Sequence, residues 1–293
     1  MGVGAGNGTR YIPGRVESAR NCANKMWNAG RVVLMNVTEK APLDTAYLTA
    51  ADQWILSRFQ DATRAISSNM EEGEFGLAAD RIYDFAWSEF CDWYIELAKS
   101  RLNGDDPVAK KAVQGVLLYV LEGLLKLLHP FMPFITGTIW QALPHEGPSV
   151  MVSAWPEYKD ELHFAAEEAQ MESLMDAVRA IRNRRAEMNV PPSKKAKVLI
   201  LTEKKDTFSA GAGFFPKLAY ASEIELIDAV PADAAKMASV VTGDAQIYMP
   251  MGDLIDFEAE RARLGKEKSK VQAAIDLAMK KLHNPKIDDK ATA

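Results

Sequence analysis

Apolar residues recur at three- and four-residue steps through the first half of the chain, a spacing typical of amphipathic helices. The first predicted helix covers residues 15–35, and its apolar stripe includes Trp27 and Val33. Further helices are predicted from about residue 45, over 77–102, over 107–128 with Asp106 as N-cap, and up to 143 after two prolines. Short polar turns separate these helices, so they predict a bundle.

After Pro144 the pattern changes to a mixture of strands and helices. Strands are predicted over residues 150–155, 197–202, 224–227 and 246–250, and helices over 165–187 and 208–221. This mixture is typical of a small α+β unit.

Residues 253–282 contain no proline and are rich in Glu, Ala, Lys, Arg and Leu. Apolar residues repeat at every seventh position from Phe257 to Ala278, which predicts one helix of a coiled coil. Arg261 and Lys268 occupy the companion seam position, so the seam is imperfect. The chain stops before a returning helix, and we expect this arm to be truncated.

The predicted fold is therefore mainly α: a helical bundle, a small α+β unit and a long C-terminal helix. We assign residues 1–14 to a lead-in segment and 15–145 to the bundle. Residues 146–252 are assigned to the α+β domain and 253–293 to the arm.

Composition places the chain among packed cytoplasmic proteins. Of its 293 residues, 48% are apolar and 26% are charged, which excludes collagen, long disorder and a disulfide scaffold. The two cysteines, Cys22 and Cys91, cannot form a disulfide framework, so a reducing compartment is expected. No run reaches the roughly 18–20 apolar residues of a membrane span. We therefore predict a cytoplasmic protein without a membrane partner.

The sequence lacks a recognisable catalytic constellation. Its four histidines are far apart, and no pair has the spacing of a helical metal site. It contains no phosphate-binding loop, no nucleophile elbow and no nucleophilic cysteine signature. We therefore predict neither a metal nor a catalytic residue in this chain, and a free-standing enzyme is the least favoured alternative.

Positive charge is concentrated in two short segments of an otherwise acidic chain. The net charge is -5, yet residues 10–31 carry +4 and residues 179–205 carry +7. The remaining residues therefore carry -16. Such segregation favours a polyanion-binding surface, although solvated helix faces also produce charge runs.

The polar face of the first predicted helix offers suitable chemistry for single-stranded bases. Arg20, Asn24 and Arg31 can donate hydrogen bonds, and Trp27 could provide a stacking plane. Because Trp27 also lies on the apolar stripe, we expect it to be in the core.

Several segments together resemble the C-terminal portion of the bacterial valyl-tRNA synthetases, which are class I aminoacyl-tRNA synthetases. The resemblance rests on RVESARNCANKMWNAGRVVLMN at residues 15–36, IYDFAWSEFCDWYIELAK at 82–99 and VRAIRNRRAEMNVPPSKKA at 178–196. The bundle motifs are shared with isoleucyl- and leucyl-tRNA synthetases, whereas DWYIELAK followed by RAEMNVPP is specific to the valyl family. This chain departs from the family in having Val32 where an aromatic is usual and Gly137-Thr138 in place of a Glu pair.

The resemblance implies a tRNA-binding fragment that recognises the anticodon. The whole enzyme joins valine to its tRNA with ATP and Mg²⁺, and its catalytic and editing domains lie upstream of this segment. We therefore expect no cofactor and no aminoacylation from this chain alone, and a monomer that works with those upstream domains. The residues expected to contact tRNA are Arg10, Arg15, Arg20, Asn24, Lys25, Asn28, Arg31, Arg179, Arg182, Arg185, Lys194, Lys195, Lys266, Lys268, Lys270, Lys280 and Lys281.

Two alternatives remain open at this point. The chain could be the corresponding part of an isoleucyl- or leucyl-tRNA synthetase. It could also be a non-enzymatic helical interaction module whose basic segments are solvated and whose terminal helix dimerises.

Overall fold

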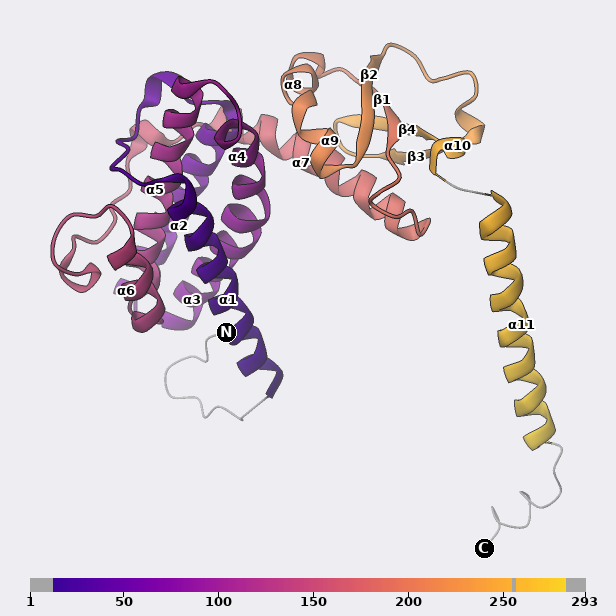
Figure 1. Cartoon of the computed structure of the whole chain (residues 1–293), viewed down its shortest axis with the longest axis horizontal. Coiled ribbons are helices and arrows are strands. Elements are labelled where there is room, and N and C mark those ends of the chain that lie inside the picture. The colour runs from indigo at the N-terminus through magenta and orange to yellow at the C-terminus, as the bar shows by residue number, and fades with distance from the viewer. Residues whose placement is uncertain (1–12, 255–256, 283–293) are drawn as a thin grey trace, which may run out of the picture. The chain divides into compact units, whose positions relative to one another are not determined.

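The structure, a computed structural model, describes residues 13–254 and 257–282 (Figure 1). Contacts divide the chain into two compact units, Met1–Ser173 and Leu174–Ala293, here called the bundle unit and the sheet unit. The described residues are mostly helical and include one four-stranded mixed sheet. The predicted mainly α fold with a small α+β part is confirmed.

The described part of the bundle unit contains six whole α-helices, one π-helical segment and the start of α7 (Ala165–Glu187). The whole elements are α1 (Pro13–Asn36), α2 (Ala50–Glu71), α3 (Phe75–Asp84), the π-helical segment Phe85–Tyr94, α4 (Ile95–Leu102), α5 (Pro107–Leu128) and α6 (Pro133–Ala142). The predicted start of α5 is confirmed, because the Asp106 side chain accepts hydrogen bonds from the amides of Val108 and Ala109. The helix predicted over 77–102 is continuous but changes to i→i+5 bonding in its middle, where the amide of Ile95 donates to the carbonyl of Phe90.

Helix α5 is the centre of the bundle unit. Its apolar residues are buried around nearly the whole circumference, so α1, α2, α4 and α6 can pack on it from different sides. Two glycines allow close approach: a Cβ on Gly123 would lie 2.3 Å from Cζ of Phe59, and one on Gly115 would lie 2.5 Å from the carbonyl oxygen of Pro42. Helix α5 is therefore a core helix.

A buried carboxylate joins the start of α2 to the end of the π-helical segment. Asp52 is 1% exposed and accepts a 2.6 Å hydrogen bond from the Tyr94 hydroxyl and another from the Arg101 guanidinium. It also completes the capping box with Thr49. Burial raises the pKa of Tyr94, so this hydroxyl stays protonated and remains a donor.

The segment after α6 lies against α2 of the bundle unit. The indole of Trp155 donates to Ser67, and the amides of Lys159 and Phe164 donate to Gln60 and Ser57. The strand predicted at 150–155 is wrong: Val150–Val152 is a 3-10 turn capped by the Ser149 side chain. Only Val150 of the turn is buried, and none of the four strands in the described part of the chain pairs with it.

The sheet unit contains strands β1 (Ala196–Thr202), β2 (Ala221–Ile227), β3 (Met237–Val241) and β4 (Ala245–Pro250) in the order β2-β1-β4-β3. β1 and β2 are parallel, whereas β4 is antiparallel to both β1 and β3. The strands predicted at 197–202, 224–227 and 246–250 are confirmed, and β3 was not predicted. The helix predicted over 208–221 is instead α8 (Lys205–Ala210) and α9 (Phe215–Leu218), followed by the start of β2.

Helices α7, α10 and α11 lie before and after the sheet strands in the sequence. Helix α7 (Ala165–Glu187) has the predicted bounds and buries Met175, Val178 and Ile181. Helix α10 (Met251–Leu254) follows β4, and α11 (Phe257–Leu282) is the predicted arm helix. Within α11 the side chains of Val271, Ile275 and Met279 are exposed.

We expect Gly123→Ala to lower the free energy of unfolding by about 1–3 kcal/mol, because the new methyl group would overlap the Phe59 ring. The matched control is Gly137→Ala in α6, where a Cβ would meet no atom within 4 Å. This control should raise stability by about 0.5–1 kcal/mol through helix propensity. Urea unfolding followed by circular dichroism measures both, and equal effects would contradict the packing around α5.

Candidate nucleic-acid interface

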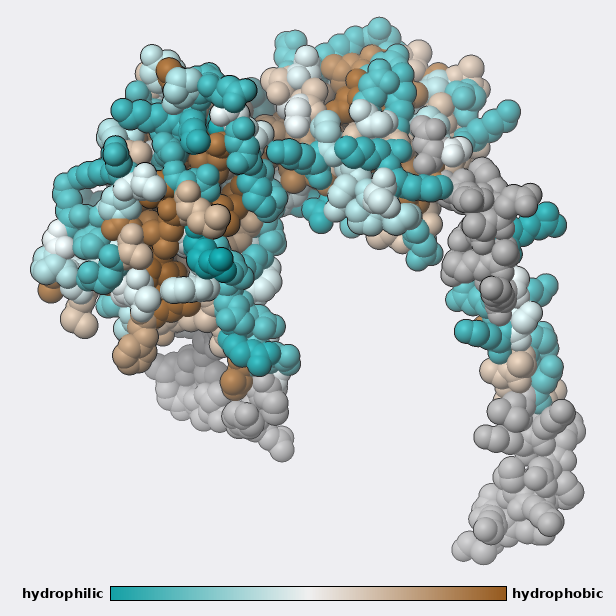
Figure 2. Space-filling view, in the orientation of Figure 1, coloured by the Kyte–Doolittle hydropathy of each residue, from teal (hydrophilic) through white to brown (hydrophobic). Residues whose placement is uncertain are grey.

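The outer face of α1 carries polar and aromatic side chains at helical spacing. Arg20, Asn24, Trp27 and Arg31 follow one another at steps of four, three and four residues, and all are exposed. Asn28 lies beside them and is exposed too. Residues at these steps share one face of a helix, so the structure brings four predicted residues, Arg20, Asn24, Asn28 and Arg31, onto one surface together with Trp27. We call this surface the α1 face. Figure 2 shows hydrophilic residues along much of α1.

The prediction that Trp27 belongs to the core is wrong, since its side chain is 43% exposed. The buried face of α1 is centred on Met26 and Val33, which pack against the bundle. Consecutive residues of an α-helix differ by about 100° around the axis, so Trp27 lies at the edge of that face. Its ring is available for stacking.

Arg20 and Arg31 are the accessible cations of the α1 face. Arg31 is exposed and has no carboxylate within ion-pair distance among the described residues. Arg20 lies 3.6 Å from Glu17, and both side chains are exposed, so this pair contributes little to stability. Both guanidinium groups can therefore turn to a phosphate or a base edge.

Lys25 has a structural role in this arrangement. Its ammonium donates to Asp92 at 2.5 Å and to the carbonyl of Trp87 at 3.3 Å, and it lies 3.6 Å from the centre of the Trp87 ring. These contacts hold α1 on the π-helical segment. Lys25 is therefore not a free cation for tRNA, unlike the sequence-based expectation.

Two predicted residues, Arg10 and Arg15, cannot be placed on this surface. Arg10 lies outside the described residues, and Arg15 lies in α1 but its side chain is not described. Both stay predictions.

Ion pairs within the sheet unit neutralise much of its basic segment. The pairs are Arg179 with Asp176, Arg184 with Glu187, Lys197 with Glu225, Lys204 with Asp244 and Lys205 with Asp228. Arg182, Lys194 and Lys195 have no such carboxylate partner among the described residues. The net charge of +7 therefore overstates how many cations are available there.

Arg185 does not lie on the surface as predicted. It is 3% exposed, and its guanidinium donates to the carbonyl oxygens of Pro191 and Lys194. It also lies 5.5 Å from the centre of the Tyr220 ring. Burial lowers its pKa, and the carbonyls replace the water that it loses. Arg185 holds the end of α7 to the turn before β1.

The arm supplies a smaller part of the predicted set. Lys268 and Lys270 are exposed on α11, whereas the side chains of Lys266, Lys280 and Lys281 are not among those described.

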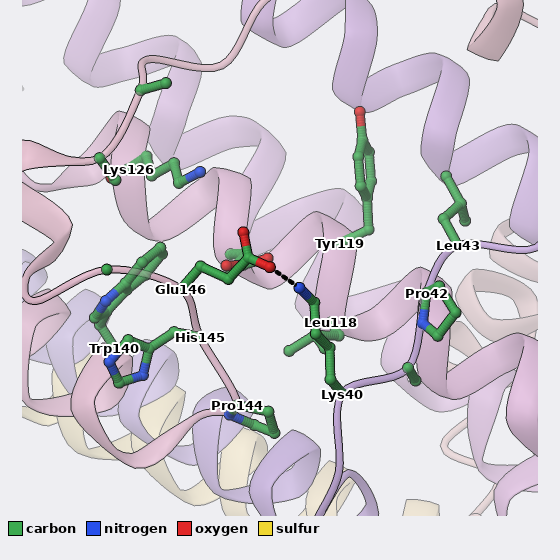
Figure 3. Close-up of a pocket in the computed structure, with 15 residues that line it drawn as sticks. Lys40, Pro42, Leu43, Leu118, Tyr119, Lys126, Trp140, Pro144, His145 and Glu146 are labelled. Carbon is green, nitrogen blue, oxygen red and sulfur yellow. Dashed lines mark hydrogen bonds and ion pairs between the residues drawn. The ribbon is translucent and has the colours of Figure 1, made fainter.

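A cavity of about 460 Å³ in the bundle unit is the largest of those described (Figure 3). Lys40 and Glu146 form an ion pair at it, and Glu122 and Lys126 add one charge of each sign. Burial raises the pKa of Glu122. Because these charges balance, the cavity has no preference for an anion.

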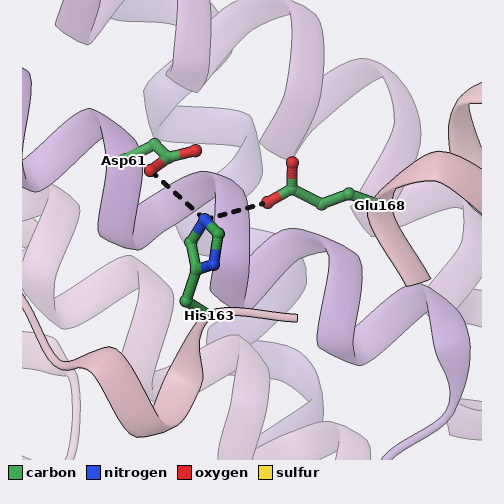
Figure 4. Close-up of side chains that lie close together, drawn as sticks. All are labelled: Asp61, His163 and Glu168. Atoms are coloured by element: carbon green, nitrogen blue, oxygen red, sulfur yellow. Dashed lines mark ion pairs between the residues drawn. The ribbon is translucent and has the colours of Figure 1, made fainter. Parts of the chain in front are cut away.

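Asp61, His163 and Glu168 lie close enough together to be examined as a metal site (Figure 4). The imidazole Nε2 lies 3.6 Å from Asp61 and 4.0 Å from Glu168. However, the guanidinium of Arg58 also lies 4.0 Å from Glu168, and its charge would repel a cation. Arg58 is fixed there by two 2.9 Å hydrogen bonds to Glu89. We interpret the group as an ion network that holds residues 163–168 on α2.

The two thiols offer no reactive centre. Burial raises the pKa of Cys91 to about 12 and also raises the pKa of Cys22, so neither is a thiolate near neutral pH.

The described part of the chain has no helix long and apolar enough to cross a membrane.

Comparison with known proteins agrees with a helical RNA-binding module. Residues 52–200 match the family described as the anticodon-binding domain of tRNA ligase, and this chain belongs to that family. The particular ligase to which it is similar is the valine–tRNA ligase. The chain is 46% identical to the valine–tRNA ligase of Clostridium acetobutylicum and 40% identical to that of Bacillus cereus. The alignments cover 99% and 100% of this chain but only 34% of each relative.

The chain thus spans about a third of the length of these relatives. The predicted resemblance to the C-terminal portion of valyl-tRNA synthetases is confirmed. Among solved structures, the leucyl-tRNA synthetase of Agrobacterium radiobacter, in a ternary complex with tRNA and LeuAMS, aligns with a TM-score of 0.42 and 13% identity. That alignment covers 74% of this chain and 26% of the synthetase.

We expect Arg185→Ala to lower the free energy of unfolding of the sheet unit by about 1–3 kcal/mol, since it leaves two carbonyls without their donor. Arg182→Ala, in the same helix but exposed, should change it by less than about 0.5 kcal/mol. Urea unfolding of the two variants measures the difference. Equal stabilities would show that Arg185 is not a structural residue.

Proposed function

We propose that this chain is the tRNA-binding part of a valine–tRNA ligase and that the α1 face contacts the unpaired bases of the anticodon loop. The observation that carries the proposal is the exposed sequence of Arg20, Asn24, Trp27 and Arg31 on one helix of a chain that belongs to the anticodon-binding family. The identities of 40–46% to valine–tRNA ligases support valine over isoleucine and leucine as the amino acid of the whole enzyme.

The α1 face combines the three interactions that single-stranded RNA requires. Guanidinium groups pair with phosphates and with base edges, and the amides of Asn24 and Asn28 can donate to and accept from a base. The Trp27 ring offers a plane for an unstacked base, which is worth about 1–3 kcal/mol in comparable sites. A double-stranded stem would present only its backbone, so this combination favours a loop.

Other cations would extend the contact to the backbone. Arg182, Lys194 and Lys195 of the sheet unit and Lys268 and Lys270 of α11 are suited to phosphates, because each can make a charged hydrogen bond without a base-specific partner. The remaining predicted lysines of the arm, Lys266, Lys280 and Lys281, would act in the same way. Arg179 is exposed but paired with Asp176 at 2.8 Å, so it would first have to exchange partners.

In this proposal the whole enzyme supplies the chemistry that the chain lacks. It would activate valine with ATP and Mg²⁺ in its upstream domains and act as a monomer in the cytoplasm. The present chain would contribute affinity and anticodon specificity and would hold no cofactor of its own.

The double variant Arg20→Ala/Arg31→Ala should weaken binding to an anticodon stem-loop of valine tRNA. Each lost phosphate contact reduces the slope of log K against log salt by about 0.7, so the slope should flatten by about 1–1.5. Filter binding across a salt series measures it. The matched control is Arg64→Ala/Arg81→Ala, which removes two exposed arginines of α2 and α3 and should leave the slope unchanged.

Specificity is tested with the same assay. Valine tRNA should bind more tightly than isoleucine or leucine tRNA, and a valine tRNA with a substituted anticodon should lose that advantage. If the double variant binds valine tRNA with unchanged affinity and slope, the assignment of the α1 face is wrong.

Trp27→Ala should reduce affinity for the stem-loop by about 5- to 100-fold, since it removes the stacking plane. Trp27→Phe should retain most of the affinity, because a smaller ring still stacks. A stem-loop carrying 2-aminopurine in the anticodon reports stacking through its fluorescence, which should be quenched by the parent chain and by Trp27→Phe but not by Trp27→Ala. Equal quenching by all three would exclude Trp27 as the stacking residue.

A further inference from the structure

The ammonium of Lys25 in α1 is held by three groups of the π-helical segment. It donates to the carboxylate of Asp92 at 2.5 Å and to the carbonyl oxygen of Trp87 at 3.3 Å. It also lies 3.6 Å from the centre of the Trp87 ring, and that ring stacks on Tyr83 at a centroid distance of 5.5 Å. An ion pair, a charged hydrogen bond and a cation–π contact therefore meet at one lysine. We call these contacts the Lys25 tie.

The π-helical register explains why these three groups lie together. In a π-helix the carbonyl of residue i accepts from the amide of residue i+5, so the carbonyl of Trp87 meets the backbone from which the Asp92 side chain starts. In an α-helix this carbonyl would pair with Cys91, and the side chain of Asp92 would lie about 100° further round the axis. The register thus builds the site for the ammonium, and π-helical turns are frequent at functional sites.

The π-helical segment is itself fixed to α2, so it can serve as a rigid support for α1. Tyr94 is fully buried, and its hydroxyl donates to Asp52 of α2 at 2.6 Å. Glu89 accepts two 2.9 Å hydrogen bonds from Arg58 of α2. Asp92 lies between these two anchored residues in the sequence. A helix tied to such a support has less freedom to lose when it binds a ligand.

Lys25 borders the α1 face on the side of the π-helical segment. It follows Asn24 directly and lies about one turn before Asn28, and both asparagines are exposed on that face. The Lys25 side chain is 22% exposed and that of Asp92 is 51% exposed, so the tie lies at the margin of the surface. Because an α-helix is stiff over one turn, loss of the tie would move the neighbouring residues of the α1 face as well.

We propose that Asp92 and Trp87 are positioning residues for the anticodon loop: through Lys25 they fix the rotation of α1 about its axis and thereby the direction of the α1 face. The inference rests on the proposed function, since it requires RNA to bind this face. Asp92 is a carboxylate beside a surface for a polyanion, where its charge alone opposes binding. Its contribution to RNA binding is the orientation that it gives to the helix. Lys25, which these partners occupy, makes no phosphate contact of its own.

The sign of the effect of Asp92→Asn tests this role. If the carboxylate acted only through its charge, its removal would strengthen RNA binding. We expect the affinity for an anticodon stem-loop of valine tRNA to fall about three- to tenfold instead, because α1 loses the contact that orients it. Asp92→Glu keeps a carboxylate within reach of the ammonium and should restore most of the affinity. The matched control is Asp84→Asn, which removes an exposed carboxylate at the end of α3 and should not weaken binding.

Lys25→Met separates orientation from direct contact. If the ammonium contacted a phosphate, its loss would reduce the slope of log K against log salt by about 0.7. We expect the affinity to fall as in Asp92→Asn while the slope stays unchanged. The double variant Lys25→Met/Asp92→Asn should bind no more weakly than either single variant, because all three break the same tie. The fluorescence of 2-aminopurine in the stem-loop should be quenched less by these variants, since Trp27 is displaced from the base.

Unchanged or tighter binding by Asp92→Asn would overturn the proposal, and so would a reduced salt slope for Lys25→Met. Circular dichroism establishes that each variant is folded under the conditions of the filter-binding assay, so that a loss of folded protein is not read as a loss of affinity. Should Asp92→Asn not fold, Trp87→Leu is measured in its place. It removes the ring under the ammonium and should lower the affinity at an unchanged slope.

The positioning role and the proposed function can fail separately in these measurements. Arg20→Ala/Arg31→Ala acts directly on the α1 face and should flatten the salt slope whatever holds the helix. A flattened slope for that variant together with unchanged binding by Asp92→Asn would overturn the positioning role alone. A parent chain that does not bind the stem-loop would overturn the proposed function and the positioning role with it.

Discussion

The direction in which α1 presents its polar residues is set by the burial of its opposite face. Met26 and Val33 are almost fully buried, and a Cβ on Gly30 would lie 3.0 Å from Ile139 of α6. A helix that is fixed on one side has no rotational freedom left, so the residues on the other side must face outward. The ammonium of Lys25 adds a polar tie to Asp92 and to the carbonyl of Trp87. The accessible surface is thus a consequence of packing behind it, and a core substitution on α5 or α6 could disturb it without touching a surface residue.

Local pairing decides which cations are available to a polyanion. An exposed pair such as Arg20 with Glu17 is worth less than about 1 kcal/mol, so an RNA phosphate can replace the carboxylate at small cost. Arg185 is different. If its guanidinium left the carbonyl oxygens of Pro191 and Lys194, these buried acceptors would lose their hydrogen-bond donor, which is costly. A count of charges along the sequence treats these arginines alike. The structure separates them by burial and by the chemistry of their partners.

The elements that depend on local signals could be predicted from the sequence, and the site only in part. Asp106 and Pro107 mark the start of α5 because the cap and the proline act within one turn. Strand β3 was missed because it is short and its burial does not alternate regularly, so it is recognised only through its hairpin pairing with β4. Val150–Val152 has strand-forming valines but lies alone, and no neighbouring strand pairs with it. Trp27 and Arg185 were misplaced for a similar reason: their burial is decided by which neighbours the tertiary fold brings to them.

Helix α1 belongs to two surfaces of opposite character. One side of its first half borders an apolar groove, and its outer face carries the guanidinium, amide and indole groups of the residues from Arg20 to Arg31. Ala19 and Arg31 are twelve residues apart, about 18 Å along the axis, and an α-helix is stiff over that length. The packing that fixes the first half of the helix therefore also fixes the position of the residues proposed to meet the anticodon loop.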